Sequence, residues 1–165
     1  MTSTTSTAAA ADAFILSYAR AVHLSAHTTD TSIIASAIGA HYGPRTSVYT
    51  PGRMPVDSSS SPVAGIATHL ARFERSGLGC DVRLAAHRVE VAEGGERGVG
   101  GRGGKGGWEW ENVYGYRRKG AEGEGEEKRI GGEEGWAKPE GYWELIVCDN
   151  EILGLLERMP NFTEL

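Results

Sequence analysis

The stretch from Trp108 to Arg118 alternates with a strict period of two, which predicts a β-strand with two chemically different faces. One face carries four aromatic rings and one amide: Trp108, Trp110, Asn112, Tyr114 and Tyr116. Rings that end in polar atoms, with an amide among them, suit the wall of a small-molecule cavity that makes a few directed hydrogen bonds. The alternative is that these rings fill a core or a dimer interface.

Two low-complexity segments flank this strand. Residues 94–107 hold nine glycines, and residues 119–140 hold six glycines and seven glutamates. Neither composition can build a core, so we expect two flexible hairpin inserts, the acidic one solvated or used as a lid. The remainder predicts one domain over residues 12–159, between a disordered tail at 1–11 and a C-terminal tail at 160–165.

Helical spacing of apolar residues predicts three helices in the first half of the chain. We expect them at about 12–25, 32–41 and 66–76, with a short strand at 46–50 before the third helix. Asp12 is the expected N-cap of the first helix.

The second half of the chain predicts long strands. Residues 81–93 alternate but change parity near His87, which predicts a β-bulge. The apolar runs 141–148 and 152–159 predict two strands joined by a tight hairpin at 149–151. The fold class is therefore α+β, with three N-terminal helices and a mixed or antiparallel β-sheet that the bulge bends.

Composition limits the partners. The formal net charge of -5 argues against nucleic acid or an anionic membrane, and no apolar run is long enough to span a bilayer. Two isolated cysteines without zinc spacing predict no metal and a cytoplasmic, reducing location, since the first residues also lack a secretory signal. The G-x-G-x-x-G match at 98–103 runs into a strand rather than a helix, so we expect no dinucleotide cofactor.

The chain resembles the NTF2-like superfamily, and its SnoaL-like branch in particular. The resemblance is carried by Tyr49-Thr50-Pro51-Gly52 after the second helix, by Gly65-Ile66 at the third, and by residues 143–152 near the end. It implies a cone in which a bent sheet wraps three helices around a deep apolar pocket, commonly in a homodimer. Members include ketosteroid isomerases, polyketide cyclases, scytalone-type dehydratases and proteins without known catalysis.

The resemblance also implies positions for site residues. Tyr18 matches the oxyanion-donating tyrosine of ketosteroid isomerases, whereas Thr50, beside Tyr49, stands where those enzymes place their general base. Glu144 matches the second carboxylate, on the penultimate strand. That exact isomerase chemistry is therefore not expected.

Glu144 and His87 are the predicted catalytic residues. If Glu144 shares an inward face with Ile146 and Cys148, burial suits it to acid/base work near neutral pH, and the alternative is that it points outward. His87 lies on a neighbouring strand and could exchange a proton, or serve only as a surface residue. The other histidines are interpreted as structural or exposed. Tyr18, Tyr49, Trp110, Asn112 and Tyr114 are the predicted substrate-binding residues.

These expectations lead to a first functional hypothesis: a cofactor-independent isomerase, cyclase or dehydratase of secondary metabolism, acting on a small apolar polyketide-like or terpenoid-like compound. A second is a non-catalytic ligand-binding or dimerisation protein, which keeps the aromatic face but needs no acid/base pair. A third is a protein-binding surface of the transport-factor kind.

Overall fold

The computed structural model describes residues 6–52, 56–57, 61–79, 81–92, 95–103, 110–118 and 141–165. These residues form an α+β fold, which confirms the predicted class, with four α-helices and one six-stranded mixed sheet. The acidic insert predicted at residues 119–140 lies outside the described residues.

Three helices precede most of the sheet, as the apolar spacing predicts, and they are α1 (Thr7–His23), α2 (Thr31–Gly39) and α3 (Pro62–Arg75). A side-chain oxygen caps each N-terminus: Ser6 accepts from the Ala9 amide at 3.2 Å, Asp30 accepts from Ser32 at 2.9 Å, and Ser61 caps α3. These hydroxyl and carboxylate oxygens satisfy amides that have no intrahelical partner.

The expected start of the first helix at Asp12 is wrong. The helix begins at Thr7, so residues 7–11 belong to it rather than to a disordered tail. Alanine is the strongest helix former, and Ala10 and Ala11 are buried, so packing and propensity extend the helix to the Ser6 cap. Residues 1–5 lie outside the described part of the chain.

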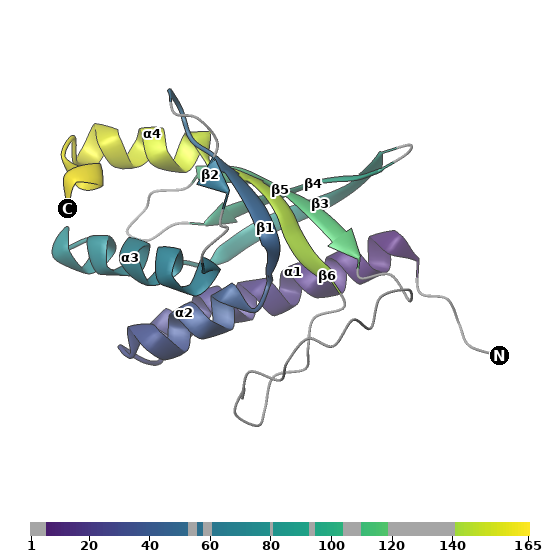
Figure 1. The fold of residues 1–165 in the computed structure, drawn as a ribbon, viewed down its shortest axis with the longest axis horizontal. Helices are drawn as coiled ribbons and strands as arrows, with labels where there is room; N and C mark the ends of the chain where they lie inside the picture. Colours follow the sequence, from purple (N-terminus) through teal and green to yellow (C-terminus); the bar gives the residue numbers. More distant parts are fainter. Residues whose placement is uncertain are drawn as a thin grey trace.

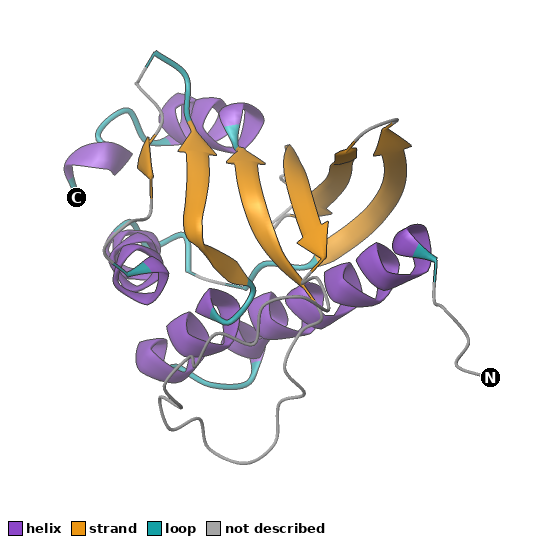
Figure 2. Ribbon diagram, turned by 45° about the vertical axis from the view of Figure 1, so that its right-hand side comes forward, coloured by secondary structure: helices purple, strands orange, loops and turns teal. Residues whose placement is uncertain are grey.

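The sheet has the strand order β2-β1-β6-β5-β4-β3, and all neighbours are antiparallel except β1 and β6, which are parallel. The strands are β1 (Tyr42–Tyr49), β2 (Val56–Asp57), β3 (Leu84–Ala92), β4 (Gly95–Gly103), β5 (Trp110–Arg118) and β6 (Gly141–Val147). In both ribbon views α1 crosses one end of the curved strands, and α4 lies at the other end (Figures 1 and 2).

Residues 95–103 of the glycine tract are not a loop, which corrects this part of the prediction for residues 94–107, while residues 94 and 104–107 lie outside the described part of the chain. Residues 95–103 form β4, which pairs with β3 on one side and β5 on the other. Glycine has low strand propensity, but its amide and carbonyl groups can complete the ladders that two neighbouring strands leave open. The pairing of β3 with β4 shifts between Leu84 and His87, which agrees with the predicted bulge.

The predictions of a final strand at 152–159 and of a hairpin at 149–151 are also wrong. The segment after β6 is the helix α4 (Asp149–Arg158). Ile152, Leu155 and Leu156 recur at helical spacing, and Leu155 is fully buried in a cluster with Phe73 of α3 and Phe162. A helix packed against α3 therefore stands where the sequence predicts a further strand of the sheet.

The main core lies between α1 and the sheet. Phe14 packs edge-on against Trp143 at a centroid distance of 4.6 Å and tilted against Tyr116 at 4.9 Å. No helix among the described residues is long and apolar enough to cross a membrane.

Candidate functional site

A cavity of about 720 Å³ lies between the helices and the inner face of the sheet. All four helices contribute side chains to it, together with β1, β3, β5 and β6. Its wall is mostly apolar, and the apolar side chains include Ile15, Val22, Ile38, Val48, Leu70, Phe73, Leu84, Ile146 and Ile152. Its size is within the range of pockets that bind small organic molecules.

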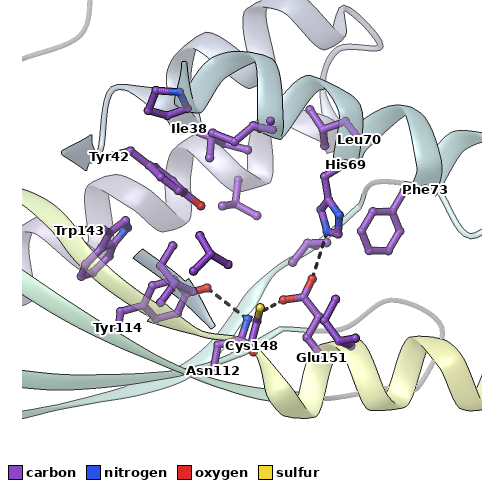
Figure 3. A pocket seen from close by; sticks show the side chains of 18 of the residues that line it. Ile38, Tyr42, His69, Leu70, Phe73, Asn112, Tyr114, Trp143, Cys148 and Glu151 are labelled. Atoms are coloured by element: carbon purple, nitrogen blue, oxygen red, sulfur yellow. Dashed lines mark hydrogen bonds and ion pairs between the residues drawn. The ribbon is translucent and has the colours of Figure 1, made fainter. Parts of the chain in front are cut away.

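A polar cluster on one side of this cavity joins three elements (Figure 3). Glu151 lies in the first turn of α4, and its Oε2 accepts a hydrogen bond of 2.6 Å from Asn112 Nδ2 of β5. Its other oxygen, Oε1, lies 3.4 Å from Nε2 of His69 on α3. One carboxylate therefore receives a strong amide hydrogen bond and a longer contact from an imidazole.

Asn112 is held deep in the wall, with 3 % of its surface exposed. Its Nδ2 also lies 3.4 Å from the Tyr114 hydroxyl, while its Oδ1 is buried without a hydrogen-bond partner. Buried polar atoms in native proteins are nearly always hydrogen-bonded, because an unmade bond costs free energy. An amide with one satisfied and one unsatisfied end is a feature expected at a ligand site.

Three tyrosines form a second polar group beside the first. The hydroxyl of Tyr18 on α1 interacts electrostatically with those of Tyr42 and Tyr114, and the rings of Tyr18 and Tyr114 pack edge-on with their centroids 5.6 Å apart. Burial raises the pKa of Tyr42 to about 12 and also raises the pKa values of Tyr18 and Tyr114 well above their ordinary range. All three hydroxyls therefore keep their protons at neutral pH and can act as hydrogen-bond donors.

Cys148, at the junction of β6 and α4, also lines the cavity. Burial raises the pKa of its thiol to about 12, with the nearby carboxylates of Glu151 and Asp149 adding to the effect. Because the thiolate is the reactive form, this cysteine is a poor nucleophile at neutral pH. Its Sγ lies 3.3 Å from the Tyr49 carbonyl oxygen.

Most of the predicted binding residues meet in this cavity. Tyr18, Trp110, Asn112 and Tyr114 all line it, and the alternate side chains of β5 share the inner face while Val113 and Arg117 are exposed. Tyr116 faces the same side but packs in the core beside Phe14. Trp108 lies outside the described residues.

Glu144 does not lie in the cavity. It is half-exposed on the outer face, where Arg117 Nε donates to its Oε1 at 2.9 Å. The expectation that it shares an inward face with Ile146 and Cys148 is wrong, because the pairing of β5 with β6 shifts between Gly115 and Tyr116. Gly115 pairs with Leu145 and Tyr116 with Trp143, so an extra residue in β6 reverses the parity at Glu144.

His87 and Tyr49 also lie away from the cavity wall. Nε2 of His87 lies 2.6 Å from Oδ1 of Asp12, where β3 packs on α1. Tyr49 is 41 % exposed on β1, and its neighbour Thr50 lines the cavity instead. The structure therefore does not bring His87 and Glu144 together.

Sequence reasoning missed three residues of this site: His69, Glu151 and Tyr42. The predicted hairpin at residues 149–151 places Glu151 in a turn, although Cys148, Glu151, Ile152 and Leu155 have the spacing of one helical face. His69 is among the histidines interpreted from the sequence as structural or exposed. Ile66, Leu70 and Phe73 around it form the apolar face of α3, so a histidine among them is a signal of a polar group that faces the interior. The interpretation does hold for His41, which is buried and contacts the Ala37 carbonyl and the Ser17 hydroxyl, each at 3.0 Å.

The described part of the chain contains no group of three or more His, Cys, Asp or Glu side chains placed to hold a metal ion. Among the described residues, His69 and Glu151 can exchange a proton, and the Asn112 amide and the tyrosine hydroxyls can form hydrogen bonds. Comparison with protein-family models, with curated proteins and with solved structures finds no match.

Proposed function

We propose that this chain is a cofactor-independent enzyme that isomerises, cyclises or dehydrates a small apolar carbonyl or hydroxy compound by acid/base catalysis. The observation that carries the proposal is the His69–Glu151–Asn112 cluster, which faces a mostly apolar cavity of about 720 Å³. An apolar wall binds the body of such a ligand, and a few polar groups orient its reacting atoms.

In this proposal His69 and Glu151 move the proton. A histidine can accept or donate a proton in catalysis, and a carboxylate beside it fixes the orientation of its ring. Asn112 positions Glu151 through the 2.6 Å hydrogen bond. Which of the two groups takes the first proton depends on the substrate.

The tyrosines supply the second half of the proposed mechanism. A carbon next to a carbonyl loses a proton more readily when donors stabilise the negative charge that develops on the oxygen. Tyr18, Tyr42 and Tyr114 stay protonated in the cavity, so their hydroxyls suit this role.

The NTF2-like cone belongs to the same proposal. It is supported by three helices that precede most of a bent mixed sheet, with β1 and β2 between the second and third helices, and by the cavity between helices and sheet. A homodimer and a polyketide-like or terpenoid-like ligand are further parts of it that rest on the sequence resemblance alone. A cytoplasmic location is another part, and it rests on the two isolated cysteines and on the composition of the first residues. Analytical ultracentrifugation of the purified chain tests the dimer.

Hydrogen–deuterium exchange into a model ketone tests the function without knowledge of the natural substrate. We expect the protein to accelerate exchange of the α-protons of 2-tetralone, a bicyclic ketone, in deuterated buffer followed by NMR. Glu151→Gln and His69→Gln should each reduce this acceleration by about 10²-fold or more, the usual contribution of a general acid or base.

Two matched controls sharpen the experiment. Glu144→Gln and His87→Gln make the same chemical changes in side chains that do not line the cavity, so they should keep the wild-type rate. Exchange no faster than in buffer, or an equal loss in Glu144→Gln, would contradict the proposed function.

A further inference from the structure

Arg72 is a cationic side chain on the cavity wall that the proposed chemistry does not use. It lies three residues after His69 in α3, so the two side chains share one face of the helix, and both line the cavity. The adjacent residues Leu70 and Phe73 of α3 are buried members of two core clusters, and the Phe73 ring lies 4.9 Å from the His69 ring between centroids. Placing a charged guanidinium beside apolar neighbours costs free energy unless a polar partner compensates for it.

The Nε atom of Arg72 is buried and has no hydrogen-bond partner. No acidic side chain among the described residues forms an ion pair with this guanidinium. A buried donor without an acceptor destabilises the protein, and more so when the group is charged. The position therefore favours a partner that the chain itself does not provide.

The position of Arg72 near the end of α3 does not remove this requirement. Cations in the last turn interact favourably with the helix dipole, and both Arg72 and Arg75 lie in that turn. Arg75 also donates to the carbonyl of Leu165, which gives it an acceptor. The dipole stabilises the charge of Arg72 but provides no acceptor for its buried Nε.

The charge on the cavity wall has the opposite sign to the charge of the whole protein. The described lining contains two arginines, Arg72 and Arg83, and one carboxylate, Glu151. His69 and Asn112 already contact Glu151, and Arg83 lies 3.4 Å from Asp81. Arg72 is thus the cation of the wall that is left for a ligand, in a chain whose formal net charge is -5.

We infer that the cavity selects ligands that carry a carboxylate, and that Arg72 binds this group while the apolar wall holds the rest of the molecule. Guanidinium groups match the geometry of carboxylates and form charge-assisted hydrogen bonds with them. This inference rests on the part of the proposed function that assigns the cavity to a small-molecule ligand. The inference narrows the substrate class to apolar carboxylic acids. Their reacting carbon would lie beside His69 and Glu151.

A pair of probes that differ only in the acidic group tests the inference. 2-Naphthylacetate and 2-(2-naphthyl)ethanol share one ring system, and dissociation constants for both come from calorimetric titration of the full chain. We expect the wild-type protein to bind the acid at least about tenfold more tightly, which is the effect of one hydrogen bond between charged groups.

Three variants assign that preference. Arg72→Gln should bind the two probes equally, whereas Arg72→Lys keeps the charge and should retain part of the preference. Arg20→Gln is the control, because it removes the same charge from an exposed position of α1 outside the cavity wall. It should preserve the wild-type ratio. Thermal unfolding of each variant shows that the fold is intact.

The outcomes separate this inference from the proposed function. Equal binding of both probes to the wild-type protein would overturn the carboxylate preference and leave the cavity as a ligand site. An acid preference that survives in Arg72→Gln would overturn the role of Arg72. If neither probe bound, the assignment of the cavity to small molecules would fail, and the inference with it.

Discussion

Replacement of Leu155 by alanine tests whether residues 149–158 form a helix that carries Glu151 to the cavity. In α4 the Leu155 side chain is fully buried against Phe73 and Phe162, whereas Leu153 is 49 % exposed. A strand would place both leucines on one face, because they are two residues apart. The pair therefore distinguishes the two structures.

The magnitude follows from the burial. Leucine to alanine removes three carbon groups, worth about 0.8 kcal/mol each when fully buried, and the cavity left behind adds to this loss. We expect Leu155→Ala to lower the free energy of unfolding by about 3 kcal/mol, or about 6–12 °C in Tm for a chain of this length. Leu153→Ala should cost at most about 1 kcal/mol, since half of its surface is already exposed.

Urea denaturation followed by circular dichroism, with the same slope imposed on the wild type and both variants, gives the two differences. Equal losses of about 1–2 kcal/mol in both variants would indicate a strand and refute the helical assignment. The position of Glu151 in the cavity would then have to be abandoned as well.

Three further predictions concern close packing and buried titratable groups. Gly141→Ala should destabilise the fold by about 1–3 kcal/mol in thermal unfolding, because its Cβ would lie 2.6 Å from the Arg117 carbonyl oxygen. Gly65 lies on α3 with open space around it, so Gly65→Ala should stabilise the fold by up to about 1 kcal/mol. Burial lowers the pKa of His41, so the unfolded chain binds the proton first; stability should fall as the pH drops below about 6.5, and His41→Gln should reduce the difference between urea midpoints at pH 7 and pH 5. The pKa of Cys148 is raised to about 12, so the unfolded thiol ionises first as the pH rises above about 9; stability should decline there, and less so in Cys148→Ser.

The helices and the aromatic strand could be predicted because their apolar periodicity is strong. The expected helices at 32–41 and 66–76 overlap α2 and α3, although α3 begins earlier, at Pro62, and the alternation of residues 110–116 identifies the inner face of β5 correctly. In these segments the local pattern and the tertiary environment favour the same conformation.

The sequence pattern of α4 does not distinguish a helix from a strand. Residues 152–156 are apolar at four of five positions, and such short runs fit either period. The burial of Leu155 against α3 decides for the helix, and that contact is made between segments far apart in the sequence.

The predictions for the glycine tract and for Glu144 were wrong for a different reason. The pairing of residues 95–103 with two neighbouring strands depends on partners that the local composition does not reveal. The inward or outward direction of Glu144 depends on one extra residue in the ladder between β5 and β6, and such a bulge reverses every side chain on one side of it. The catalytic carboxylate predicted from the sequence thus lies on the opposite face from the cavity.

The central claim is that the functional site is the cavity beside His69 rather than the surface around His87. Histidine ring resonances in ¹H–¹⁵N NMR spectra, assigned with His69→Gln and His87→Gln and titrated with 2-naphthylacetate, test it most directly. The account predicts that the ring signals of His69 shift to saturation while those of His87 stay in place. A shift of His87 with His69 unchanged, or no shift of His69 at a saturating probe concentration, would contradict it.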